Sequence, residues 1–155
     1  MKPSFSSRFA ALSVLGLACM QGSMLATPAA AQSDPSADNP SGTWLLDDGH
    51  YQVQVLPQAG GRWHAKIMAL GPGVATKDVK NPNAALRARD VVGTDLFWNL
   101  RWNSQERKFT DGTLYAPEYG KTIAATAWLE GPNTLRVQGR VLMITRTRTL
   151  KRVAN

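Results

Sequence analysis

The chain has 155 residues, of which 43% are hydrophobic and 19% are charged. This length supports one domain with a substantial core, and the hydrophobic content excludes a wholly disordered chain. Lys and Arg outnumber Asp and Glu by 18 to 11, which gives a net charge of +7. Such an excess is typical of proteins that meet nucleic acid or an anionic surface. The single cysteine, Cys19, can form no intramolecular disulfide and no cysteine-based zinc site.

Residues 1–31 have the three-part layout of a secretory signal peptide. A positively charged start and a short apolar run precede three alanines that end at Ala31, where we expect cleavage. The protein is therefore predicted to be periplasmic or secreted, with no transmembrane segment after cleavage. A lipoprotein attached through Cys19 is the less favoured alternative, because Gly16 stands where a lipid-attachment motif prefers Leu.

Cleavage would also change the charge. It removes two basic residues and leaves 16 against 11 acids, a net charge of +5. Residues 32–41 are predicted to be a flexible lead-in and 42–153 the folded domain. The basic residues gather near the end of the chain, so the excess is local, and an exported protein is not expected to meet nucleic acid. Six of the 16 are Arg136, Arg140, Arg146, Arg148, Lys151 and Arg152.

Apolar and polar residues alternate through most of the folded domain. This period of two is typical of half-buried antiparallel strands. The apolar positions are Tyr51, Val53 and Val55; Trp63, Ala65, Ile67 and Ala69; Leu96, Trp98, Leu100 and Trp102; Ile123, Ala125, Ala127 and Leu129; and Leu135, Val137, Gly139 and Val141. Turn residues separate these runs at 47–49, 60–61, 111–112 and 131–133.

About eight such strands predict an all-β fold, a single antiparallel up-and-down barrel, because closure removes exposed strand edges. Residues 71–90 lack alternation and are expected to form one long loop, with a helical turn that begins after Asn83. We expect side chains to fill the interior. The inward tryptophans would be Trp63, Trp98 and Trp102, set against small residues; a ligand pocket walled by them is the alternative.

An ordered set of short segments runs through the whole folded domain. They are Gly42-Thr43-Trp44, Lys80-Asn81-Pro82, Leu86-Arg87-Ala88-Arg89, Gly93, Gly112-Thr113-Leu114-Tyr115, Pro117-Glu118, Gly120-Lys121-Thr122 and the tail from Arg146 to Val153. Together they resemble the bacterial family known as domain of unknown function 2147. The resemblance implies a small exported protein with a lipocalin-like or calycin-like barrel and no assigned activity.

The opening Gly42-x-Trp44 is also similar to the start of lipocalins, in which a tryptophan near the closed end packs under an arginine of the last strand. The resemblance implies Arg152 as that partner, with Arg148 second. A guanidinium over an indole contributes about 0.5–2 kcal/mol, so this pair would be a structural latch.

Motifs for catalysis are missing from residues 32–155. His50 and His64 fall on polar strand faces without metal-ligand spacing, no serine lies in a G-x-S-x-G elbow, and no glycine-rich phosphate loop is present. We therefore predict no metal site, no cofactor and no enzyme activity. The candidate ligand-binding residues are Asp78, Lys80, Asn81, Arg87, Arg89, Tyr115, Glu118 and Lys121, with Trp98 and Trp102. The interpretation that we favour for these loops is structural, with Arg87 or Arg89 paired with Glu118 to pin the long loop.

The last hairpin can form in two registers. If Leu142-Met143 alone make the turn, Arg146 and Arg148 point into the barrel and would form an anion-binding pocket. One more residue in the turn directs both outward. We favour the outward register, because an unpaired arginine inside a barrel costs several kcal/mol.

These features predict a non-catalytic monomer that binds a small hydrophobic or amphipathic anionic ligand of the cell envelope. One alternative is an envelope interaction protein with a packed core, whose basic face meets acidic lipid head groups or a partner protein. Another is a hydrolytic enzyme in which Asp78 or Glu118 is the acid–base group.

Overall fold

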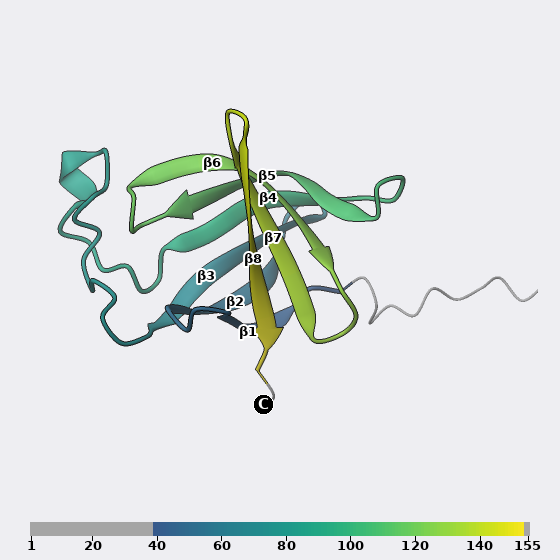
Figure 1. Ribbon diagram of the computed structural model, residues 1–155, viewed down its shortest axis with the longest axis horizontal. Coiled ribbons are helices and arrows are strands. Elements are labelled where there is room, and N and C mark those ends of the chain that lie inside the picture. The colour runs from purple at the N-terminus through teal and green to yellow at the C-terminus, as the bar shows by residue number, and fades with distance from the viewer. Residues whose placement is uncertain (1–38, 154–155) are drawn as a thin grey trace, which may run out of the picture. The chain divides into compact units, whose positions relative to one another are not determined.

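The computed structural model describes residues 39–153, so the predicted signal peptide and Cys19 lie outside the described residues. Antiparallel strands follow one another in chain order around a closed barrel, and β1 pairs with β8 to complete it (Figure 1). The predicted up-and-down barrel is confirmed. Its strands are β1 (Gly42–Leu46), β2 (Tyr51–Gln58), β3 (Arg62–Leu70), β4 (Asp95–Asn103), β5 (Lys108–Ala116), β6 (Lys121–Leu129), β7 (Thr134–Val141) and β8 (Ile144–Arg152).

The long connection between β3 and β4 carries the one helical element among the described residues. The 3-10 helix η1 (Ala84–Leu86) begins where the Asn83 side chain accepts a hydrogen bond from the Ala85 amide at 3.1 Å. The helical turn and its cap are therefore as predicted. A bridge between Lys77 and Asp90 ties the two arms of the loop together.

Irregularities in the strand register change which side chains face the barrel interior. On the β3–β4 ladder, β4 has an extra residue near Asn99, whose φ is 62°. An extra residue reverses the inward–outward alternation, so Phe97 is buried in the core and Trp98 is not. A second irregularity, on the β2–β3 ladder, leaves Ala69 exposed. The predicted inward placement of Trp98 and Ala69 was wrong for this reason.

The Asp111-Gly112 pair lies inside β5 and does not form the predicted turn. The β5–β6 ladder shifts between Phe109 and Gly112, and Asp111 has a φ of 60°. A Cβ atom at Gly112 would lie 2.4 Å from Cδ2 of Leu100, so the glycine lets β4 side chains approach closely. The turn between β4 and β5 is made by residues 104–107 instead.

Aromatic side chains close one end of the barrel. The Phe109 ring lies 6.3 Å from that of Trp63 and 4.9 Å from that of Trp102, measured between centroids. Such tilted and edge-on contacts are favourable beyond the area that they bury. At this end the interior is packed, as expected from the sequence.

The first and last strands meet at Trp44 and Arg152, which are paired across the ladder at the same closed end. The Arg152 guanidinium carbon lies 4.2 Å from the ring centroid of the fully buried Trp44. The indole donates a 2.9 Å hydrogen bond to the Pro40 carbonyl, and Arg152 Nε donates a 2.7 Å one to the Pro132 carbonyl. The contact is the one implied by the resemblance to lipocalins, with Arg152 as the partner.

Candidate ligand-binding site

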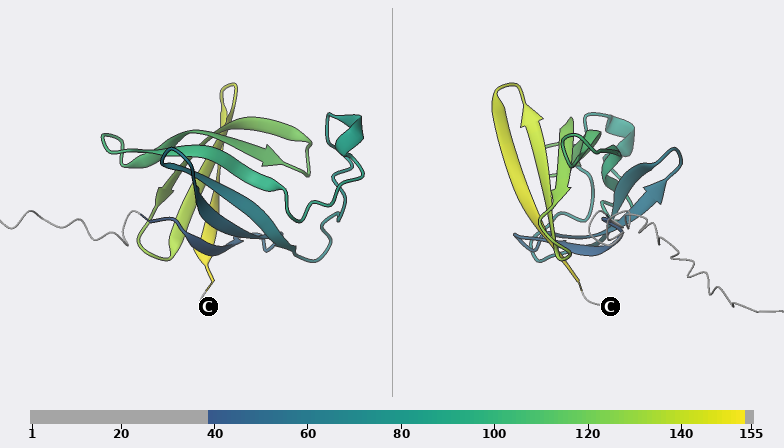
Figure 2. Two further views of the ribbon diagram at one scale, coloured as in Figure 1. Left: turned by 180° about the vertical axis from the view of Figure 1, so that it is seen from behind. Right: turned by 90° about the vertical axis from the view of Figure 1, so that its right-hand side faces the viewer.

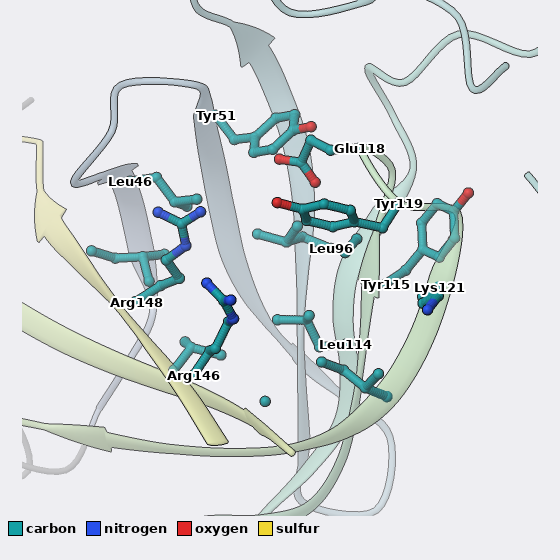
Figure 3. Close-up of a pocket in the computed structure, with 15 residues that line it drawn as sticks. Leu46, Tyr51, Leu96, Leu114, Tyr115, Glu118, Tyr119, Lys121, Arg146 and Arg148 are labelled. Carbon is teal, nitrogen blue, oxygen red and sulfur yellow. The ribbon is translucent and has the colours of Figure 1, made fainter. Parts of the chain in front are cut away.

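A cavity of about 300 Å³ occupies the opposite, open end of the barrel. Its walls come from β1, β2 and β4–β8, and the turn between β5 and β6 forms part of its rim (Figure 3). The interior is therefore packed at one end and hollow at the other, which the expectation of a filled barrel did not anticipate. The lining residues are Leu46, Tyr51, Leu96, Leu114, Tyr115, Ala116, Glu118, Tyr119, Lys121, Ile123, Val137, Gly139, Arg146, Arg148 and Leu150.

Arg146 and Arg148 face this cavity because of the register of the last hairpin. Leu142-Met143 alone form its turn, and the ladder pairs Gly139 with Arg146 and Val137 with Arg148. Directly opposed residues share a face of the sheet, and both partners on β7 line the cavity. Figure 3 shows the two guanidinium groups directed into it. The outward register that we favoured was wrong.

The inward arginines avoid the desolvation penalty on which that expectation depended. Both side chains are exposed at the open end of the barrel. In addition, Nη1 of Arg148 lies 3.1 Å from Oδ2 of Asp48 and 3.8 Å from Oδ1 of Asp47. Within the described part of the chain, no carboxylate lies within 4.0 Å of the Arg146 guanidinium. Arg146 is therefore the cation available to an anionic group in the cavity.

Tyr51 and Glu118 meet at the rim, where the Tyr51 hydroxyl is directed toward the Glu118 carboxylate (Figure 3). Burial raises the pKa of Tyr51 above its ordinary value, and the charge of Glu118 and a hydrogen bond to it raise it further. Tyr51 therefore stays protonated and acts as a hydrogen-bond donor. These two residues also line a second cavity of about 220 Å³ beneath the β3–β4 loop.

Four predicted site residues form a cluster that we call the loop clip: the buried Asp78, Asn81 and Tyr115, and the half-buried Arg89. The Tyr115 hydroxyl donates a 2.6 Å hydrogen bond to Oδ1 of Asp78, and Asn81 Nδ2 donates one of 2.7 Å to Oδ2. Arg89 completes the clip, with Nε 2.9 Å and Nη2 2.8 Å from the same Oδ2. The clip thus attaches the β3–β4 loop to β5.

The loop clip explains why Asp78 is a poor candidate for an acid–base group. Burial alone would raise the pKa of Asp78, but hydrogen bonds from Tyr115, Asn81 and Arg89 and the charge of Arg89 together lower it below the ordinary value. Burial and the bond to Asp78 raise the pKa of Tyr115 to about 12. Asp78 is therefore charged at neutral pH, and both of its carboxylate oxygens accept hydrogen bonds, so it acts as an anchor for the loop. Arg89 pairs with it and not with Glu118, so the predicted Glu118 pairing was wrong.

The remaining predicted residues are dispersed. Lys121 and Glu118 line the main cavity, whereas Lys80 lines the second one. Arg87 donates a 2.9 Å hydrogen bond to the backbone carbonyl of Asn81 and so supports the loop. The two tryptophans lie elsewhere: Trp98 lines an outer groove beside Arg89 and Asn81, and Trp102 packs on Phe109 at the closed end.

The sequence interpretation missed part of the apolar cavity wall. Tyr51, Leu96, Ile123 and Val137 were already on predicted inward faces, so their alternation carried the signal. Leu46, Leu114 and Leu150 join them only through the strand register. No group of three or more His, Cys, Asp or Glu residues among positions 39–153 could hold a metal ion. In the same residues there is no helix both long and apolar enough to cross a membrane.

Residues 42–152 match a family model described as an uncharacterised protein conserved in bacteria, DUF2147. The chain belongs to this family. It is also similar to a solved structure, protein HP1028 from the human pathogen Helicobacter pylori, described as belonging to the lipocalin family. That likeness has a TM-score of 0.66 at 21% identity, and covers 76% of this chain and 84% of that chain. At this identity it shows the fold alone, a lipocalin-like barrel. No curated protein matches the sequence.

Proposed function

We propose that this DUF2147 protein binds a small amphipathic anion, with the apolar part inside the barrel and the anionic group at Arg146 and Arg148. The observation that carries the proposal is the inward register of the last hairpin, which places two guanidinium groups over an apolar cavity. The lipocalin-like fold is compatible with such a role. The predicted signal peptide suggests that the ligand belongs to the cell envelope.

The two ends of the cavity favour different parts of one molecule. The wall formed by Leu96, Leu114 and Ile123 favours burial of an alkyl or ring system, at about 25 cal/mol for each Å² removed from water. A guanidinium forms its strongest hydrogen bonds with carboxylate or phosphate, often with two at once. Arg146, which has no carboxylate within 4.0 Å among residues 39–153, supplies such a guanidinium near the rim.

Other groups at the rim narrow the class of ligand. Glu118 lines the same cavity as the two arginines, and its carboxylate would repel a second negative charge on the ligand. The Tyr51 hydroxyl directs its one proton to Glu118, so the arginines are the groups left to bind an anionic head group. The arrangement suits a single anionic head group joined to an apolar body.

Native mass spectrometry of protein purified from the bacterial periplasm tests the proposal directly. We expect a reproducible adduct of lipid-like mass. Purified protein should also bind anilinonaphthalene sulfonate and dodecanoate, and should bind dodecanoate better than dodecanol. Arg146→Gln should lower dodecanoate affinity by about tenfold, the loss of a charge-assisted hydrogen bond.

Arg140→Gln is the matched control, because Arg140 lies on the same hairpin but pairs with Thr145 on the outward face. It should leave dodecanoate affinity unchanged. Equal losses in Arg146→Gln and Arg140→Gln, or equal affinity for the acid and the alcohol, would contradict a specific anion site. A protein that carries no adduct and binds neither probe would contradict the binding role itself.

A further inference from the structure

The tip of the β7–β8 hairpin exposes consecutive large apolar side chains. Leu142 is 88% exposed, Met143 91% and Ile144 64%. Figure 2 shows this tip projecting past the ends of the neighbouring strands. Single exposed apolar residues are ordinary, but a contiguous apolar tip on a projecting hairpin marks an interaction site.

Local turn chemistry does not account for these residues. Leu142 has a φ of 53°, in the left-handed region that favours glycine and asparagine. A two-residue hairpin turn is most easily made by Gly or Asn with a small polar residue. The sequence instead places Leu142-Met143 there. Leucine is unfavourable at a positive φ, and two exposed apolar side chains lower solubility, so their presence points to a role for the side chains.

The chemistry around the tip is strongly cationic. Residues 134–152 contain six Lys and Arg and no Asp or Glu. Arg140 and Arg146 lie on the two strands just behind the tip, both exposed, and Arg140 Nε donates a 3.3 Å hydrogen bond to the Leu142 carbonyl. An apolar point backed by cations matches the layered chemistry of a lipid surface, in which anionic head groups lie above hydrocarbon.

We propose that residues 142–144 are a docking tip that inserts into the head-group boundary of an anionic lipid bilayer. The tip is a convex projection, so it suits a surface that it can penetrate. Arg140 and Arg146 would then lie at the level of the lipid phosphates. This goes beyond ligand binding: because Arg146 also lines the cavity, docking would bring the open end of the barrel to the membrane surface.

The test compares partition of the protein onto vesicles of phosphatidylglycerol and phosphatidylcholine with partition onto phosphatidylcholine alone. All proteins carry the same N-terminus, so any contribution of residues 1–38 cancels. We expect binding to the anionic vesicles only. The Leu142→Gly/Met143→Ser variant should lower the partition coefficient by about tenfold, because it removes the two apolar side chains that would insert into the bilayer. Glycine suits the φ of position 142, so this variant should remain folded.

Met68→Ser is the matched control, since Met68 is another exposed apolar residue, 49% exposed, on β3. It should partition as the unaltered protein does. Arg140→Gln should weaken binding about fivefold, the effect of one cation near an anionic surface. Equal partition of the Leu142→Gly/Met143→Ser variant and the unaltered protein overturns the proposal, as does equal binding to the two kinds of vesicle.

A site-specific probe gives a second, independent measurement. Met143→Cys, carrying an environment-sensitive fluorophore in a Cys19→Ser background, should shift its emission to the blue when anionic vesicles are added. The same label at Met68→Cys should not shift. No shift at position 143 overturns insertion of the tip. Dodecanoate binding without vesicles should survive in the Leu142→Gly/Met143→Ser variant, so the failure of one proposal is distinguishable from the failure of the other.

Discussion

Arg146 lies directly opposite Gly139 across the β7–β8 ladder, and the two residues face the same cavity. Gly139 has no side chain, so the Ile123 side chain packs close to the β7 backbone; a Cβ atom at position 139 would lie 2.4 Å from its Cδ1. The wall at this point is therefore thin and apolar. The arginine next to it has open space in front of its guanidinium.

Enlarging residue 139 should narrow the cavity from within. In Gly139→Val the new side chain should displace Ile123 toward the cavity, reduce dodecanoate affinity and lower the free energy of unfolding by about 1–3 kcal/mol. Adding Ile123→Ala should restore part of the affinity and part of the free energy of unfolding, because the smaller side chain at position 123 makes room for the methyl groups of the new valine. Calorimetric titration and urea denaturation measure the two effects. Unchanged affinity in Gly139→Val would place the ligand elsewhere.

Trp44 should be among the most destabilising positions to truncate. Trp44→Ala should lower the free energy of unfolding by about 3–5 kcal/mol, the usual result for a buried tryptophan. Arg152→Met keeps the aliphatic contact but removes the charge and the hydrogen bonds to the Pro132 and Ser41 carbonyls, so it should cost more than the about 0.5–2 kcal/mol of the cation–π contact. Arg148→Met, at an exposed arginine near the open end, is the control. A Trp44→Ala protein with unchanged melting temperature would rule out the latch.

The loop clip should make the stability of the β3–β4 loop depend on pH. The pKa of Asp78 is lower in the folded protein than in the unfolded chain. Its contribution is therefore fully present above the ordinary aspartate pKa of about 4, and is lost as the pH falls through the lowered folded value. Asp78→Asn should remove this acid dependence and lower stability by about 1–3 kcal/mol at neutral pH.

Hydrogen exchange of the amides in residues 71–94 measures how far the loop clip protects the loop. Asp90→Asn is the control, because Asp90 pairs with Lys77 at 2.8 Å on the exposed surface. It should change stability by no more than about 1 kcal/mol. Equal protection of the loop in Asp78→Asn and in the unaltered protein would show that the clip does not hold the loop.

Tyr115 should lose its proton only at high pH, and the loop clip should be lost when it does. Its pKa is raised to about 12, so its contribution is present below the ordinary tyrosine pKa of about 10 and is lost as the pH rises through about 12. Tyrosinate absorbance of Tyr115→Phe, compared with the unaltered protein, isolates this group. Tyr119→Phe, at an exposed tyrosine, is the control variant. An absorbance titration of Tyr115→Phe that keeps the step near pH 12 would contradict the buried hydroxyl bond to Asp78.

Local patterning was enough to predict the strands and their buried faces. Tyr51, Val53 and Val55 are all buried, as their alternation indicated. The same reasoning failed at Trp98 and Ala69. A bulge depends on the pairing with the partner strand, so the alternation of residues within one strand does not reveal it. Asp111-Gly112 misled for a related reason. Positive φ serves a bulge as well as a turn, and the dipeptide alone does not distinguish them.

The candidate site depended more on context. Asp78, Asn81, Arg89 and Tyr115 were chosen together from two loops, and the structure brings them together. Their hydrogen bonds, however, occupy both oxygens of the Asp78 carboxylate, so Asp78 anchors the loop. We predicted the register of Arg146 and Arg148 from the cost of burying an arginine in a closed interior. The barrel is open at that end, so both side chains are exposed, and Asp48 pairs with Arg148.

The sequence alone determined that this is an antiparallel barrel of the DUF2147 family, closed by Trp44 and an arginine of the last strand. These features follow from residue period and from an ordered set of short segments, which are local properties of a chain. Only the tertiary structure decided where the barrel is hollow and what faces the hollow. A cavity is the volume left between side chains of many strands, so its place and its charge depend on register, and one residue more in the last turn would have directed Arg146 and Arg148 to the outside.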